Sequence, residues 1–141
     1  VAEYVVASLD VRLGWSPVFP LALRIMGLAA AVAGYDVLLV WAMVSNAFFV
    51  STVRIQEERK QTVATGGPYR YVRHPGYVGT LLLHWGVPFM LNSLWAIIPA
   101  VAMTLVLVAR TALEDRTLRD ELPGYQEYAE RVRYRLIPGV W

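Results

Sequence analysis

The feature that most constrains the fold is a long apolar run near the amino terminus. Residues 17–47 read PVFPLALRIMGLAAAVAGYDVLLVWAMVSNA, with Arg24 and Asp36 as the only charged residues. At about 1.5 Å per helical residue, a helix of this length can cross a hydrocarbon core of roughly 30 Å. Arg24 can reach the near interface with its side chain, whereas Asp36 should face protein or water. The run predicts one membrane-spanning helix.

Two more apolar stretches, 76–91 and 93–109, are separated by Asn92-Ser93. Because the first is short for a full span, the pair predicts a helical hairpin, tilted or partly re-entrant. Residues 110–121 have charged, helical character, and Pro123-Gly124 ends that helix before a second short helical piece and an extended tail. With 57% hydrophobic and 17% charged residues, the chain predicts an all-α integral membrane bundle with a C-terminal helical segment on one membrane face.

The other segments contain weaker signals. Residues 1–16 are mixed in composition, with a loop at GWSP, and 48–73 read as extended chain and turns because STVRIQ and QTVAT alternate and GGP breaks the chain. The chain begins at Val1 without a Met or a signal-peptide pattern. We interpret residues 1–141 as a single domain, and the missing Met is compatible with earlier helices being absent from it.

The positive charges predict the topology. The connector and the tail hold most Lys and Arg residues, and the hairpin turn holds none: Arg54, Arg59, Lys60, Arg70 and Arg73 precede the hairpin, and Arg110, Arg116, Arg119, Arg131, Arg133 and Arg135 follow it. By the positive-inside rule, the connector and the tail share the cytoplasmic side and residues 1–16 lie opposite. The same placement explains the basic pI better than nucleic-acid binding does.

Several classes of chemistry are disfavoured by the sequence. The absence of Cys excludes disulfides, thiolate metal sites and a Cys nucleophile, and two His residues argue against a His-based metal site. There is no GxGxxG after a strand, no P-loop, no HExxH and no GxSxG. What remains is a polar group of residues predicted to meet at one membrane face: Arg73, His74, Tyr77, Glu114, Asp115, Tyr125, Tyr128, Arg131 and Arg135.

Each member of this group has a structural interpretation beside the functional one. Arg73 can be a basic anchor at a helix end, and His74 can be a capping residue before Pro75. Glu114 and Asp115 can be a solvated helix end. The functional interpretation is that the carboxylates meet Arg73 across the shared face and orient a zwitterionic ligand in a pocket open to a lipid-like partner. His84, within an apolar stretch, is better explained as a packed or pore-facing residue than as a ligand.

Two motifs then carry a family resemblance. GGPYRYVRHPGYVG and, after the hairpin, LEDRTLRDELPGYQEYAERVRYRLIPGVW resemble the isoprenylcysteine carboxyl methyltransferase and phospholipid methyltransferase superfamily, with the bacterial-type members most similar. The resemblance covers roughly residues 40–141. It implies a membrane helical bundle that binds S-adenosyl-L-methionine in a cytosolic-side pocket closed by the C-terminal segment. The implied activity is methyl transfer to a lipophilic acceptor from the bilayer, with membrane lipid as a partner and no nucleic acid or metal.

The resemblance also implies roles for individual residues. The cofactor would be held by Pro68, Tyr69, His74, Pro75, Tyr77 and Glu114, with Leu136, Ile137 and Pro138 folded over the adenine. Arg73, Glu114 and Arg131 would act at the catalytic or acceptor side. The acceptor stays open between a prenylcysteine-like carboxylate, a phospholipid amine and a small hydrophobic thiol or amine. One departure is Gly76, where the family often has a larger apolar residue such as Met.

Two alternatives remain. Membrane sterol and steroid reductases have RHPxY-like and YRxIPG-like segments and would transfer a hydride from NADPH. Their C-terminal signature usually includes Cys and Trp positions that LPGYQEYAERV lacks, and they are longer, which favours the methyltransferase. A non-enzymatic membrane scaffold protein would bind neither cofactor.

Overall fold

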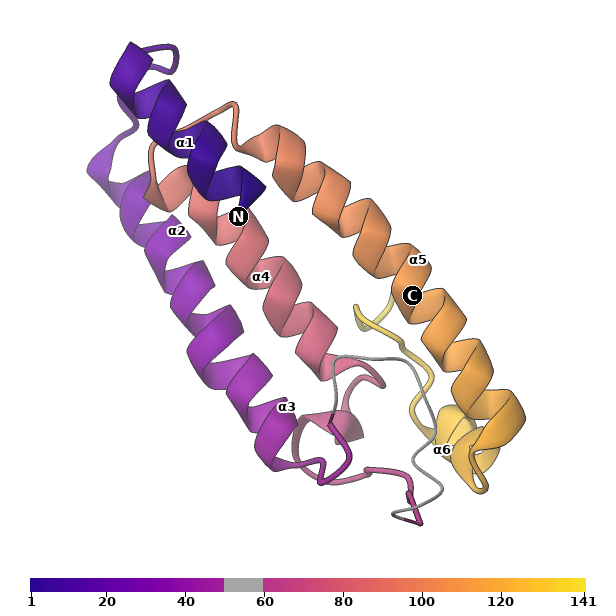
Figure 1. Cartoon of the computed structure of the whole chain (residues 1–141). Coiled ribbons are helices and arrows are strands. Elements are labelled where there is room, and N and C mark those ends of the chain that lie inside the picture. Colours follow the sequence, from indigo (N-terminus) through magenta and orange to yellow (C-terminus); the bar gives the residue numbers. More distant parts are fainter. Residues whose placement is uncertain (50–59) are drawn as a thin grey trace.

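The computed structural model describes residues 1–49 and 60–141, and all regular secondary structure within these ranges is helical (Figure 1). In chain order the elements are α1 (Ala2–Leu13), α2 (Leu21–Val32), η1 (Ala33–Leu39), α3 (Val40–Val44), η3 (Gly67–Arg70), α4 (Pro75–Met90), α5 (Ile97–Glu121) and α6 (Tyr125–Arg131). The predicted all-α fold is confirmed. The STVRIQ segment of the predicted connector, with Arg54 and Arg59, lies outside the described residues.

The first predicted span is continuous from Leu21 to Val44, through α2, the π-helical turn η1 and α3. Its 24 residues correspond to about 36 Å of helix, enough to cross a bilayer. Most of its apolar window is exposed, as is that of α5, the other helix long and apolar enough to span. A soluble core helix would bury that surface, so these exposed apolar helices indicate an integral membrane protein. Asp36 is also exposed, on the outer side of η1.

Helix α4 packs antiparallel along the first span through four glycines (Figure 1). Gly27 lies against Gly86, and Gly34 lies against Gly79. A Cβ added at Gly27 would lie 2.6 Å from the backbone nitrogen of Met90, and one at Gly79 would lie 2.9 Å from that of Leu39. Small residues allow this backbone approach, which drives helix association where water is absent. We call these four glycines the glycine seam.

The predicted hairpin is formed by α4 and α5, which are joined by residues 91–96. Asn92 has a positive φ of 60° in this turn, a conformation that Asn tolerates. Its side chain accepts a hydrogen bond from the backbone of Phe19 and so ties the turn to the start of the first span. Within the described residues, α4 packs more extensively on α2 and η1 than on α5. The hairpin is therefore a looser pair than the glycine seam.

Helix α1 was not expected from the sequence, and its surface is inverted relative to a soluble helix. Its polar residues Glu3 and Asp10 are buried, whereas Val5, Leu9 and Val11 are exposed. The Asp10 carboxylate accepts hydrogen bonds from the Ser16 backbone at 2.8 Å and from the Ser93 hydroxyl at 2.5 Å, tying α1 to the turn before α5. Glu3 pairs with His84 of α4, with 2.8 Å between Oε2 and Nδ1. An apolar outer face suits a lipid environment.

Candidate functional site

The last residues of the chain form a closed segment that lies against the start of α4. We call residues 132–141 the C-terminal strap. The Arg73 backbone N–H donates to the Tyr134 carbonyl at 2.9 Å, and that of His74 donates to the Arg135 carbonyl at 3.0 Å. The strap turns back on itself because three consecutive N–H groups, of residues 135–137, donate to the Trp141 carbonyl. The strap therefore fixes the backbone immediately before Pro75.

A buried carboxylate lies at the centre of this arrangement. Asp115, on α5, is fully buried and accepts hydrogen bonds from three arginines. Arg73 Nε and Nη2 reach its two oxygens at 2.7 and 3.2 Å. Arg135 Nε and Arg119 Nε lie 2.9 and 3.1 Å from Oδ2. These charge-assisted bonds connect α5, the strap and the segment before α4, and we call them the Asp115 cluster.

Arg73 is held by hydrogen bonds to Asp115 and to the backbone of the strap. Its Nη1 also donates to the carbonyls of Val132 and Arg133, at 2.7 and 2.8 Å. The residue is 4% exposed. Its guanidinium donors are therefore largely used inside the protein, and the geometry favours Arg73 as a residue that holds the strap in place.

Glu114, the residue before Asp115, has different surroundings. Its side chain is 25% exposed, and Oε2 accepts a hydrogen bond from the Tyr77 hydroxyl at 2.5 Å. That hydroxyl in turn accepts a hydrogen bond from Arg110 Nε at 2.7 Å. His74 stacks on the Tyr77 ring, with its Nδ1 3.8 Å from Glu114 Oε1. One hydroxyl thus fixes the orientation of a carboxylate that solvent can still reach.

These polar side chains border a cavity of about 330 Å³. Its polar lining includes Arg73, His74, Tyr77, Arg110, Glu114 and Tyr125. Its apolar lining includes Leu39, Phe48, Phe49, Leu107, Leu118 and Leu122. The polar residues come from the ends of α4 and α5 and from α6, whereas Leu39 and Leu107 come from the two long apolar helices. The cavity is therefore lined by both charged and apolar side chains, as small-molecule sites commonly are.

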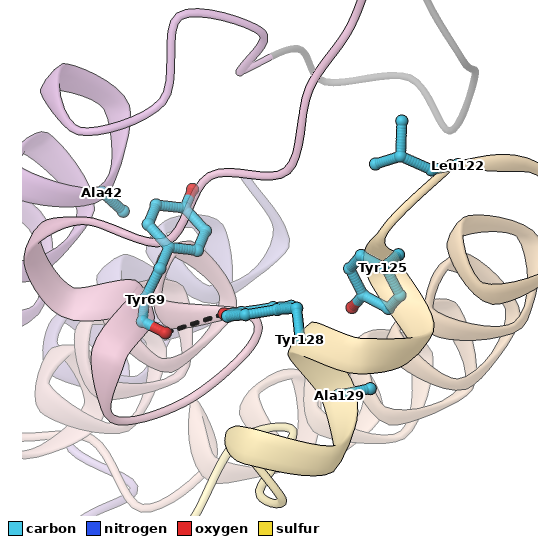
Figure 2. Packing of buried hydrophobic residues seen from close by; sticks show 6 residues of the cluster. All are labelled: Ala42, Tyr69, Leu122, Tyr125, Tyr128 and Ala129. Atoms are coloured by element: carbon cyan, nitrogen blue, oxygen red, sulfur yellow. Dashed lines mark hydrogen bonds between the residues drawn. The ribbon is translucent and has the colours of Figure 1, made fainter.

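Three tyrosines close the cavity on the side of α6. Figure 2 shows Tyr125 and Tyr128 on α6 near Tyr69, with the Tyr128 hydroxyl donating to the Tyr69 carbonyl at 2.7 Å. The Tyr125 hydroxyl donates to Asp115 Oδ1 at 3.0 Å. Burial, and then the Asp115 charge, raise the pKa of Tyr125 above its ordinary value, and burial also raises the pKa of Tyr69 and Tyr128. All three hydroxyls therefore stay protonated at neutral pH.

The departure at Gly76 has a local explanation. A Cβ at this position would lie 2.9 Å from Phe49 Cε2 and 3.5 Å from Leu39 Cδ1. Phe49 thus occupies the space that a larger residue at 76 would need, and it lines the cavity itself. At this point the cavity wall is formed by Phe49, from the segment that follows the first span, instead of by a side chain of α4.

The structure brings only part of the predicted set to the cavity. Arg73, Glu114, Tyr69, His74 and Tyr77 line it. Six other predicted residues are outside the lining: Pro68, Pro75, Arg131, Leu136, Ile137 and Pro138. Of these, Pro68, Pro75 and Leu136 are buried, whereas Arg131, Ile137 and Pro138 are exposed. The roles themselves stay predictions.

Sequence reasoning missed several lining residues. Arg110 lies one turn before Glu114 on α5, and this spacing could have placed both on one helix face. Asn46, Phe48 and Phe49 follow the first span, and the segment 61–64 precedes η3. These residues have no motif of their own, so only the packing of distant segments identifies them.

Comparison with known proteins gives consistent results. The family model described as phospholipid methyltransferase matches residues 15–122. A probable protein-S-isoprenylcysteine O-methyltransferase of Oryza sativa subsp. indica is 34% identical over 113 residues, which cover 76% of this chain and 57% of that protein. A 7-dehydrocholesterol reductase of Arabidopsis thaliana is 30% identical over 107 residues, covering 73% of this chain and 25% of the reductase. The chain thus spans a quarter to somewhat over half of these relatives.

The fold also has a counterpart among solved structures. A eukaryotic intramembrane Ras methyltransferase, the isoprenylcysteine carboxyl methyltransferase, superposes with a TM-score of 0.77 at 24% sequence identity. The superposition covers 99% of this chain and 50% of that protein. All described helices therefore belong to an arrangement already seen in a membrane enzyme.

Proposed function

Since the chain belongs to the phospholipid methyltransferase family, we propose that it transfers a methyl group from S-adenosyl-L-methionine to a lipophilic acceptor at the membrane. One observation carries the proposal. The cavity is lined by charged side chains, among them Glu114, and by apolar side chains of the spanning helices, Leu39 and Leu107. A water-soluble cofactor and a lipid-like acceptor need such a site, because each must reach the same point from a different phase.

The residues present fit the cofactor. Glu114 offers a half-buried carboxylate for its ammonium group, and Tyr77 and Arg110 fix that carboxylate from the other side. Phe48, Tyr69 and Tyr125 offer aromatic surface for an adenine. We assign the strap an indirect role, because its backbone positions His74 while Leu136, Ile137 and Pro138 lie outside the cavity.

The proposed chemistry makes few demands on side chains. When bound, the cofactor supplies a methyl group on a sulfonium for an in-line displacement, so the protein has to position the reactants and exclude water. The apolar lining excludes water, and the Asp115 cluster keeps the walls in place. A carboxylate acceptor needs no base. An amine or thiol acceptor has to lose a proton and therefore needs a base as well.

The acceptor side of the proposal centres on Arg110. Arg131 is exposed and outside the cavity lining, and Arg73 is bound within the Asp115 cluster. Arg110 lines the cavity about one helical turn after Leu107 on α5, and its Nε donates to the Tyr77 hydroxyl. A guanidinium there suits an acceptor with a carboxylate or phosphate group. This favours a prenylcysteine-like carboxylate or a phospholipid over a small neutral acceptor.

We also propose that the site faces the cytoplasm. Lys60, Arg70, Arg116, Arg119 and Arg133 lie in the segments that surround it, whereas the turn 91–96 at the opposite end of α4 and α5 has no basic residue. The positive-inside rule orients the chain accordingly.

A reductase that uses NADPH is the second candidate, and the similarity to a 7-dehydrocholesterol reductase favours it. NADPH carries several phosphate groups, which proteins bind mainly with arginines and helix N-termini. Among the described lining residues, Arg73 and Arg110 are the arginines, and Arg73 already binds Asp115 and two carbonyls. The cavity therefore supports a cofactor with an ammonium better than one with phosphates.

Calorimetric titration of the purified protein in detergent separates these functions. We expect binding of S-adenosylhomocysteine, and binding of NADPH alone would replace the proposal with the reductase. Binding of neither would indicate a scaffold protein. A transfer assay with labelled S-adenosyl-L-methionine and a panel of prenylcysteine, phospholipid and thiol acceptors then identifies the acceptor class.

A further inference from the structure

The outer side of the strap exposes apolar side chains that the cavity does not use. Tyr134, Ile137 and Val140 are 38%, 51% and 76% exposed, and Arg133 is exposed beside them. We call these four residues the strap face. Leu136, between them in the sequence, is 3% exposed and points into the protein. The strap thus has a buried side and an apolar, basic outer side.

The strap face is held in a fixed conformation. Arg135 binds Asp115, and its guanidinium lies 4.9 Å from the centre of the Trp141 ring. The Trp141 carbonyl accepts three backbone hydrogen bonds and closes the turn. The exposed side chains are therefore presented by a closed loop.

Its position in the fold places it at the membrane boundary. The strap is paired with residues 73 and 74, immediately before α4 enters the bundle at Pro75. Figure 1 shows the strap running from α6 back toward the start of α4. The strap face is therefore level with the end of the membrane-spanning helices.

The charges on two neighbouring surfaces differ. The outer side of α6 exposes four polar residues, of which two are acidic and one is basic, a surface suited to water: Gln126, Glu127, Glu130 and Arg131. The strap face carries Arg133. Arg70 and Tyr71 are also exposed, just before the residues that pair with the strap. Tyrosine together with arginine is the composition of a lipid headgroup contact.

We propose that the strap face docks into the headgroup region of a membrane rich in anionic phospholipids. Tyr134, Ile137 and Val140 enter the interface, and Arg133 contacts lipid phosphates or carboxylates. Docking stabilises the pairing of the strap with residues 73 and 74. The lipid surface thereby acts on the segment that carries His74. This inference concerns a surface outside the cavity and does not depend on methyl transfer.

Site-directed spin labelling tests the docking. The chain has no cysteine, so Val140→Cys creates a single labelling site, and Glu127→Cys on α6 gives the matched control. In nanodiscs containing phosphatidylglycerol, the label at 140 should collide with oxygen more than with a water-soluble nickel complex, and the label at 127 should show the reverse. Equal access of the nickel complex to both labels would overturn the proposal.

The preference for anionic lipid is tested by changing the charge of the lipid and, separately, the charge of the protein. We expect the label at 140 to lie closer to the lipid in phosphatidylglycerol than in phosphatidylcholine nanodiscs. The Arg133→Gln variant should lose this difference, since one arginine near an anionic surface contributes roughly fivefold to its occupancy. A lipid-facing label that responds to neither lipid charge nor Arg133→Gln would rule out anionic lipid as the partner. Thermal unfolding of both variants checks that they remain folded.

Discussion

The glycine seam and the Asp115 cluster hold α4 in opposite ways. At the seam, backbones meet at Gly27, Gly34, Gly79 and Gly86, with no side chain between them. At the cluster, the start of α4 is held by long charged side chains around one buried carboxylate. The seam lies within the membrane-spanning part, and the cluster lies at its end.

The difference follows from the surroundings. Lipid gives no hydrophobic incentive for helices to associate, so close van der Waals packing of small residues provides the contact. At the membrane face water competes for every polar group, and a buried charge is tolerated only when it is paired and hydrogen-bonded. The seam should therefore respond to added volume and the cluster to removed charge.

Removing the central charge should have the largest effect. Asp115→Asn leaves Arg73 buried without its counter-charge, which costs about 3–5 kcal/mol. We expect a lower thermal midpoint and loss of S-adenosylhomocysteine binding. Glu114→Gln is the matched control because it removes the same charge one residue earlier, at a partly exposed site. That variant should keep its thermal midpoint and lose ligand affinity several-fold, and similar unfolding of both variants would contradict the division of roles.

Adding one methyl group to the seam should have the next largest effect. The Cβ of Gly34→Ala would lie 2.7 Å from Leu82 Cβ and 2.8 Å from the Leu83 backbone nitrogen. Overpacking of this kind costs about 1–3 kcal/mol. Gly66→Ala is the control, since no atom lies within 4 Å of its added Cβ. Equal thermal midpoints for the two variants in detergent would show that the two helices can move apart at the seam without loss of stability.

The two tyrosines of α6 allow a hydrogen bond to a charged acceptor to be compared with a hydrogen bond to a neutral acceptor. Tyr125→Phe removes a hydrogen bond to the Asp115 carboxylate, and Tyr128→Phe removes one to the Tyr69 carbonyl. Bonds to charged groups contribute about 1.5–3 kcal/mol, against about 1 kcal/mol for neutral ones. Tyr125→Phe should therefore lower the free energy of unfolding more. The reverse order would mean that the cluster does not depend on Tyr125.

The polar pair inside the membrane should show the smallest effect. Glu3 and His84 are partners between α1 and α4. A double-mutant cycle with Glu3→Ala and His84→Ala, read from unfolding in detergent, should give a coupling energy of about 1 kcal/mol. A coupling energy of about 3–5 kcal/mol, the cost expected for Asp115→Asn, would instead mean that a second charge-dependent contact lies beside the seam.

The main helices could be predicted because their signals are long and local. The first span, the hairpin and α6 follow from apolar runs and from Pro123-Gly124. Helix α1 was not predicted because two of its polar residues, Glu3 and Asp10, face the interior of the bundle. Unless the surrounding lipid is taken into account, the sequence of this segment shows only a mixed composition. The preference of α4 for α2 over α5 was hidden too, since chain proximity suggested the hairpin partner.

The site was predicted where residues are close in sequence to a motif. His74, Tyr77 and Glu114 belong to such motifs and line the cavity. The expected meeting of Arg73 with a carboxylate is confirmed at Asp115, but the motif could not reveal that two strap carbonyls also bind this guanidinium, because the strap is distant in sequence. It also could not predict that Phe49 fills the space beside Gly76.

The glycine seam has a mechanical consequence. Backbones in direct contact at two glycine pairs cannot slide or separate without losing that contact, so α2, η1 and α4 act as one rigid plate. Helix α5 packs less extensively on α4 and carries Leu107, Arg110 and Glu114. A bulky molecule that enters the cavity from the side of the helices must therefore displace α5, and the plate serves as the fixed wall against which it moves.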